Sequence, residues 1–285
     1  MKKINFKKVL TSLSLLMLLG CGINGGTKEE SMKLTKEELK VAGDNKKKIL
    51  EILLSKASYK EAFKSVKDNK EEKEKLEALE RGVVNDYYIL SKAGEKVKVT
   101  KEEIKEIYDA NKKDLNGKKL EEVSDAIENL IGRAKLKDQL SKEILIIKDK
   151  YKIGEGLSKE EIEKQRKELD IELSKAIYKE ANENFKSKKQ KEEMTVLKRR
   201  KVNDYYILTE AKKNVKVTEE EIKEVYENNK KDLEGKKLEE VHQAIENLIY
   251  ENKVKAEVTN VLKKINEKYD IDKIVEGYLA ENSKK

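Results

Sequence analysis

The chain lacks residue types on which several classes of protein depend. It has no proline and no tryptophan, and it has one cysteine and one histidine among 285 residues. A single cysteine excludes a disulfide framework and a zinc knuckle built from cysteine pairs. A single histidine excludes a multi-histidine metal site, so we expect no metal and no cofactor. The absence of proline, with lysine, glutamate, leucine and isoleucine abundant, favours long helices.

The charge is large in amount but almost balanced in sign. Charged residues make up 43% of the chain, the net charge is +8, and Lys2, Lys3, Lys7 and Lys8 supply half of that excess. The remaining excess is too small for a basic nucleic-acid surface, so we expect no nucleic-acid partner. High charge with 37% hydrophobic residues also occurs in disordered chains. The helical spacing of the apolar residues argues against disorder here.

The N-terminus has the pattern of an export signal. Four lysines precede an apolar run from Val9 to Leu19, which is too short to span a bilayer. The run ends in Leu18-Leu19-Gly20-Cys21, which resembles a bacterial lipobox, although an ordinary signal with an incidental cysteine remains the alternative. This resemblance implies that residues 1–20 form a signal peptide and that Cys21 carries fatty acyl chains such as palmitate, two or more of which give stable membrane anchoring.

The residues after Cys21 favour a tethered protein of the cell envelope. Residues 21–33 are polar and glycine-rich, so they are expected to be a flexible tether. The protein would then be lipid-anchored in the bacterial envelope, on the periplasmic face of the outer membrane or on the cell surface. ATP is not expected there, and the chain has no phosphate-binding glycine loop.

The body of the chain is an internal duplication. Residues 85–131 and 203–249 are identical at 35 of 47 positions with a constant offset of 118. Residues 54–62 and 173–181 also match, with an offset of 119. Each repeat has about 120 residues, which is enough for a core of its own. We therefore predict two domains, residues 34–153 and 157–285, with a boundary at the glycines between them.

Helix starts predict an all-α fold in both repeats. Thr35, Thr100, Ser158 and Thr218 are each followed three residues later by glutamate, which is a capping box, and each is flanked by the apolar pair of a hydrophobic staple. Apolar residues then recur at helical spacing, and each series predicts a helix of about thirty residues. They are Leu120, Val123, Ile127, Leu130, Ile131, Leu140, Ile144 and Ile147, and then Leu238, Val241, Ile245, Leu248, Ile249, Val258, Leu262 and Ile265.

Several of these segments resemble one family of extracytoplasmic foldases. Residues 97–115 (VKVTKEEIKEIYDANKKDL) and 215–233 (VKVTEEEIKEVYENNKKDL) look like the signature of SurA-like and PrsA-like proteins, and residues 203–214 and 238–271 resemble the helices before and after it. The resemblance implies two tandem SurA-N-like helical chaperone units. In full-length relatives a parvulin prolyl isomerase domain follows the signature, but here only residues 112–118 and 230–236 lie at that point. These stretches are too short for a domain, so we expect no isomerase.

Three further patterns were weighed as sites. His242 could act as a general base, but the first repeat has Ser124 at that position. The run from Asp109 to Leu120 lacks the glycine and glutamate that a calcium-binding EF-hand loop requires at its sixth and twelfth positions. The doublets Tyr87-Tyr88 and Tyr205-Tyr206 could each turn one apolar ring toward a groove for client proteins, or all four could belong to the core.

The sequence therefore favours a chaperone over an enzyme. We expect a membrane-anchored, ATP-independent holdase whose partners are unfolded or nascent exported proteins, including outer-membrane proteins. The alternative is a structural or adhesive surface lipoprotein that binds one folded partner. No repeated acid–base arrangement supports catalysis, so we expect no enzymatic activity and no catalytic residues.

Overall fold

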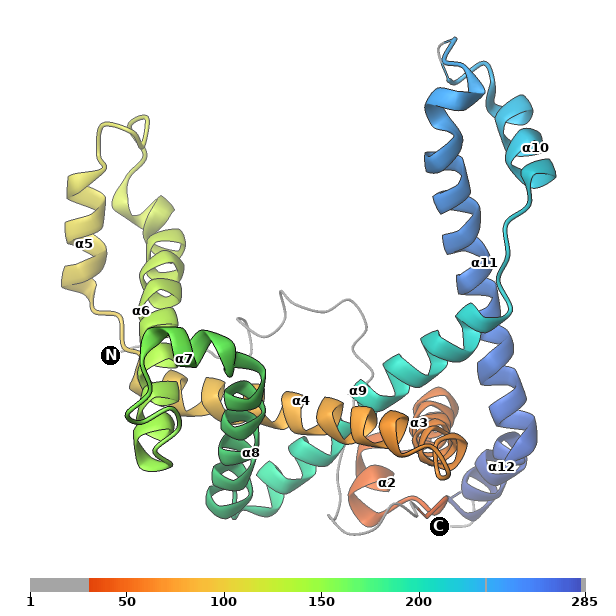
Figure 1. Cartoon of the computed structure of the whole chain (residues 1–285), viewed down its shortest axis with the longest axis horizontal. Coiled ribbons are helices and arrows are strands. Elements are labelled where there is room, and N and C mark those ends of the chain that lie inside the picture. The colour runs from red at the N-terminus through yellow and green to blue at the C-terminus, as the bar shows by residue number, and fades with distance from the viewer. Residues whose placement is uncertain (1–30, 234, 283–285) are drawn as a thin grey trace. The chain divides into compact units, whose positions relative to one another are not determined.

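The described part of the protein is all-α, as predicted. The computed structural model describes residues 31–233 and 235–282 and contains no strand within them. Cys21, the predicted signal peptide and most of the proposed tether lie outside the described residues. The helices are α2 Lys36–Ala42, α3 Lys46–Ser65, α4 Lys70–Lys96, α5 Lys101–Ala110, α6 Leu120–Lys150, α7 Lys159–Lys164, α8 Arg166–Asn184, α9 Lys188–Lys213, α10 Glu219–Asn229, α11 Leu238–Lys268 and α12 Ile271–Asn282 (Figure 1).

The local signals read from the sequence are present. All four capping boxes form, with the side-chain oxygen of Thr35, Thr100, Ser158 or Thr218 accepting from the backbone N–H three residues on. The two long helices, α6 and α11, have 31 residues each. Each repeat therefore contributes a short capped helix followed by a long one.

The compact units of the structure combine parts of both repeats. One unit consists of residues 81–187, and we call it the inserted unit. The other, within the described residues, consists of residues 31–80 and 188–282, and we call it the flanking unit. The predicted ranges 34–153 and 157–285 remain the limits of the sequence repeats. The inserted unit combines the end of α4, α5 and α6 of the first repeat with α7 and α8 of the second. The flanking unit combines α2, α3 and the start of α4 of the first repeat with α9 to α12 of the second.

The inserted unit contains the second part of α4 together with α5, α6, α7 and α8. α5 and α6 form an antiparallel hairpin whose small core is Ile104, Val123 and Ile127 (Figure 1). At the other end of the unit, the rings of Tyr88 and Phe185 meet edge to face with their centroids 5.2 Å apart. The end of α8 is thereby packed against α4.

The flanking unit has the larger core. α3 contacts α9, α11 and α12 there, and α10 and α11 form a second antiparallel hairpin. The inserted unit has no counterpart of α12, because residue 153 is followed by a turn and α7. The buried residues of this main cluster are Leu34, Ala42, Ile49, Ile52, Leu53, Ala57, Ala211, Val254, Val261, Ile265, Ile271 and Val275.

Candidate client-binding surfaces

The two helical hairpins carry the motif that suggested a foldase. We call α5–α6 hairpin 1 and α10–α11 hairpin 2. In hairpin 1 the Nζ of Lys135 donates to the carbonyl oxygen of Lys98, at 2.7 Å, and to the carboxylate of Glu103. In hairpin 2 Lys253 donates to the carbonyl oxygen of Lys216, also at 2.7 Å, and pairs with Glu221. The extended segment before each short helix is thus fixed to the long helix in the same way in both repeats.

The tip of each hairpin is fixed by a tyrosine of the same motif. The hydroxyl of Tyr108 donates to the carbonyl oxygen of Lys118, and that of Tyr226 donates to the carbonyl oxygen of Lys236, at 2.8 Å in both cases. These bonds join the end of the short helix to the start of the long helix. The motif residues therefore hold together the two helices of each hairpin, which is a structural role.

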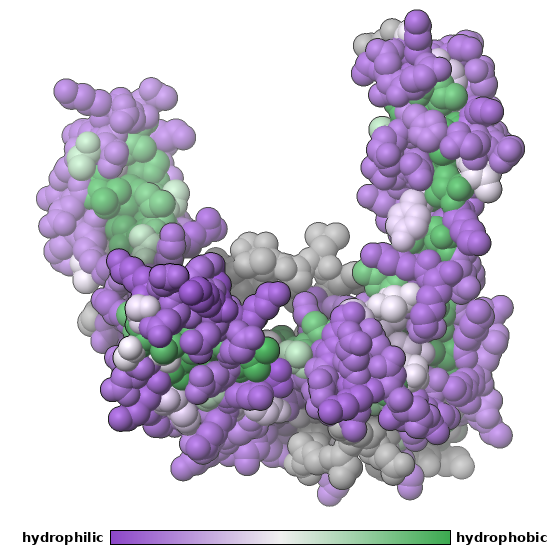
Figure 2. Space-filling model, in the orientation of Figure 1, coloured by the Kyte–Doolittle hydropathy of each residue, from purple (hydrophilic) through white to green (hydrophobic). Residues whose placement is uncertain are grey.

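Large apolar side chains remain exposed on the long helices. Leu130 on α6 is 62% exposed, and Leu248, its equivalent on α11, is 53% exposed. Both repeats retain this leucine although neither packs it in the core. Figure 2 shows hydrophobic surface over both hairpins between hydrophilic residues. Such surface can bury apolar segments of another protein, which is what a holdase requires.

α6 exposes two further apolar residues that its counterpart does not have. Leu145 and Ile146 are 56% and 53% exposed near the end of α6. The equivalent positions in α11 are Lys263 and Lys264, both exposed. The inserted unit therefore has more exposed apolar surface on its long helix than the flanking unit has.

The four tyrosines of the doublets contribute to packing within their units. Tyr88 is buried, and the rings of Tyr87 and Tyr88 both lie about 5.2 Å from the ring of Phe185. Tyr205 and Tyr206 pack partly buried against the core formed by α3, α4 and α9, and the Tyr205 hydroxyl donates to Glu72. A role for these four rings in client binding stays a prediction, and the exposed leucines are the better candidates.

The tyrosine environments raise several pKa values. Burial raises the pKa of the Tyr206 hydroxyl to about 12, with Glu210 and Glu61 adding to the effect. The hydrogen bond that Tyr151 donates to Glu180 raises its pKa to about 12 as well. For Glu61, burial raises the pKa, but donors from Lys268 and Tyr269 outweigh burial and hold the pKa below its usual value. All these groups keep their ordinary charge state at neutral pH.

The remaining candidate positions form no reactive arrangement. The Nε2 of His242 lies 3.1 Å from a carboxylate oxygen of Glu219 on the surface of hairpin 2. Within residues 31–233 and 235–282, no group of three or more histidine, cysteine, aspartate or glutamate side chains could hold a metal ion. Asp109 therefore belongs to no such cluster in the described structure.

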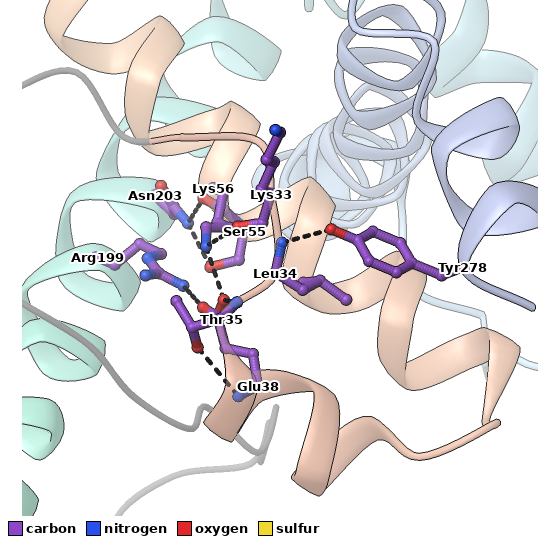
Figure 3. Close-up of polar contacts among 9 residues, drawn as sticks. All are labelled: Lys33, Leu34, Thr35, Glu38, Ser55, Lys56, Arg199, Asn203 and Tyr278. Atoms are coloured by element: carbon purple, nitrogen blue, oxygen red, sulfur yellow. Dashed lines mark hydrogen bonds and ion pairs between the residues drawn. The ribbon is translucent and has the colours of Figure 1, made fainter. Parts of the chain in front are cut away.

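A buried ion cluster in the flanking unit was not anticipated from the sequence. Glu38 is fully buried, and its carboxylate accepts from Lys56 Nζ at 2.7 Å and from Arg199 at 3.5 Å (Figure 3). Lys56 also donates to the carbonyl oxygen of Lys33 at 3.0 Å, and the backbone N–H of Leu34 donates to the Tyr278 hydroxyl at 2.8 Å. The only sequence signal for Glu38 was its place in a capping box, which does not indicate burial.

The comparisons identify no relative of the chain. No family model, no curated protein and no solved structure matches it significantly. None of the helices in the described residues combines the length and apolar character needed to cross a membrane. The described residues form an all-α protein of two units, and each unit has a hairpin that exposes large apolar side chains. The function is therefore argued from these exposed side chains.

Proposed function

We propose that the protein is a lipid-anchored, ATP-independent holdase of the bacterial cell envelope, similar to SurA-like and PrsA-like foldases but without an isomerase domain. Its clients would be unfolded or nascent exported proteins. Cys21 would hold it at the membrane, and the hairpins would bind clients. The observation that carries the proposal is the exposure of Leu130 and Leu248 at equivalent positions of the two hairpins.

The mechanism is reversible burial of apolar surface. An unfolded client exposes apolar segments that would otherwise associate with one another. Contact with an exposed leucine removes part of that surface from water, and complete burial of such a side chain contributes about 1.5–3 kcal/mol. Several contacts of this size give binding that is useful yet reversible, and no nucleotide is consumed. The charged residues around the leucines keep the complex in solution.

Aggregation of a chemically denatured client tests the proposal. Residues 22–285 are expected to suppress light scattering by the diluted client without nucleotide. The double substitution Leu130→Glu/Leu248→Glu is expected to weaken client binding about tenfold, because it removes two apolar contacts of about 1 kcal/mol each or less. No suppression by the unmodified protein at stoichiometric excess would contradict the proposal.

A matched control separates apolar contact from added charge. Ala126 and Ala244 are exposed on the same two helices and are equivalent in the repeats. Ala126→Glu/Ala244→Glu adds the same charge without removing a large apolar side chain, so it is expected to leave suppression almost unchanged. Equal losses in both double variants would attribute the effect to charge and would contradict apolar binding.

The breadth of binding separates a holdase from an adhesive lipoprotein. A photo-reactive residue at Leu130 or Leu248 is expected to crosslink many exported proteins in cells. Capture of one folded protein in stoichiometric amount would favour the alternative of a structural or adhesive surface lipoprotein.

A further inference from the structure

α8 in the inserted unit and α3 in the flanking unit are equivalent in the repeats, and the same contacts hold both. We call each of them the docked helix of its unit. In the inserted unit, the side-chain nitrogen of Asn85 donates to the carbonyl oxygen and hydroxyl of Ser174, at 2.8 and 3.0 Å. In the flanking unit, Asn203 donates to the carbonyl oxygen and hydroxyl of Ser55, at 2.8 and 3.1 Å (Figure 3). Asn85 and Asn203 are equivalent in the repeats, as are Ser174 and Ser55.

A second set of contacts repeats about two turns further along α3 and α8, nearer the C-terminal end of each helix. Lys150 Nζ lies 2.5 Å from Glu180, and the hydroxyl of Tyr151 donates to the same carboxylate at 2.8 Å. In the flanking unit Lys268 Nζ lies 2.5 Å from Glu61, and the Tyr269 hydroxyl donates to it at 2.6 Å. In both units, a lysine and a tyrosine at the end of the long helix therefore bind one glutamate of the docked helix.

The docked helix comes from the other repeat each time. Ser55 and Glu61 lie on α3 of the first repeat, but they bind residues of the second repeat. Ser174 and Glu180 lie on α8 of the second repeat, but they bind residues of the first. The docked serine precedes its asparagine by 148 residues in one unit and follows it by 89 in the other. Recognition thus depends on the surfaces in contact and not on how the chain joins them.

From this independence we propose that the α3-binding surface of the flanking unit also accepts α3 from a second copy of the chain. Two chains would then form a dimer by reciprocal exchange of α2 and α3. The hinge is Val66–Asn69, the four residues between α3 and α4. A second copy carries the same Ser55 and Glu61, so every contact of the closed chain is remade between chains, which is the condition for domain swapping.

The closed chain competes with this dimer through effective concentration. A short connection gives the intrachain helix an effective concentration of the order of 1 mM, so dilute wild-type protein stays monomeric. Exchange of α2 and α3 becomes detectable when substitutions weaken the contact of α3 with its own chain but not its contact with the second chain. The Glu61–Lys268 pair offers such substitutions. When one chain carries a reversed charge at residue 61 and the other at residue 268, the pair is repulsive within each chain and attractive between the two chains.

A pair of charge reversals tests the proposal. In a Glu61→Lys chain, and in a Lys268→Glu chain, the closed form brings like charges together. When the two are unfolded, mixed in equal amounts and refolded, reciprocal exchange joins the substituted residues in one unit and the native Glu61 and Lys268 in the other. We expect a species with twice the mass of one chain by light scattering coupled to size-exclusion chromatography.

The doubly substituted chain is the control. Glu61→Lys/Lys268→Glu restores an attractive pair within one chain, so it is expected to fold with native helical circular dichroism and to remain at the mass of one chain. A mixture that stays monomeric or unfolded while this control folds would overturn the proposal. So would dimers of equal amount in each single variant alone, because those would not depend on the exchanged pair.

Discussion

At the scale of single residues, the internal repeat provides its own controls. Glu38 and Glu161 are both capping-box glutamates at equivalent positions. Glu38 is buried with Lys56 and Arg199, whereas Glu161 is exposed and its pKa is lowered mainly by the hydroxyl and backbone of Ser158. The two glutamates occupy the same position of a capping box, but they are expected to contribute differently to stability.

Glu38→Gln is expected to destabilise the flanking unit by about 3–5 kcal/mol, because it removes the buried negative charge that pairs with Lys56 and Arg199. Urea unfolding followed by circular dichroism measures the loss. Glu161→Gln removes only an exposed capping contact and is expected to cost about 1 kcal/mol or less. Similar losses from both substitutions would contradict the interpretation of Figure 3 as a stabilising cluster.

Tyr206 predicts a dependence of stability on alkaline pH. Its pKa is about 12 in the folded protein and 10.0 in the reference state. The unfolded chain therefore loses the proton first, and the contribution of Tyr206 is complete below pH 10 and is lost as the pH rises through 12. The free energy of unfolding of wild type should fall more steeply in that window than that of Tyr206→Phe. Parallel curves from pH 7 to 12 would exclude this contribution.

At the scale of elements, the hairpins show how far sequence patterns reach. Capping boxes and apolar spacing predicted α5, α6, α10 and α11, because these signals are local and depend on one helix at a time. Burial within the long helices was less predictable. Ile127 and Leu130 belong to the same apolar series, yet Ile127 is buried and Leu130 is exposed. Which face meets a partner depends on tertiary packing, which a single apolar series does not specify.

Ile127→Ala and Leu130→Ala test that distinction. Ile127 on α6 packs against α5, so its truncation is expected to cost about 2–5 kcal/mol of stability. Leu130→Ala is expected to change stability by less than about 0.5 kcal/mol while weakening client binding. Thermal melts by circular dichroism check the first effect, and light scattering with a denatured client checks the second. Comparable destabilisation by the two substitutions would contradict the assigned core.

At the scale of the whole molecule, the sequence did not predict that each compact unit combines helices of both repeats. The duplication was evident, and two domains in chain order followed from it. Two equivalent helices and two equivalent binding surfaces permit either pairing, because the Asn–Ser and Lys-Tyr–Glu contacts are the same in both. The repeat therefore specifies the contacts but leaves open which copy of the helix makes them.

The two units are expected to unfold in separate steps. The main core of the flanking unit includes α12 and is much larger than the core of hairpin 1. Calorimetry should show two transitions, with the inserted unit unfolding at the lower temperature. Glu38→Gln should lower only the upper transition, and Ile127→Ala only the lower one. A single cooperative transition shifted by both substitutions would contradict this expectation.

Because α3 and α8 each pack with residues of the other repeat, the order in which segments of a new chain emerge affects its folding. A chain that emerges from its N-terminus, during synthesis or during export, presents α3 well before residues 188–282, with which α3 finally packs. The first matching surface to emerge is that of residues 81–153, which later belongs to α8. The emerging chain therefore offers α3 an equivalent binding surface before its final one is complete, and α3 is expected to exchange the first surface for the second as folding proceeds.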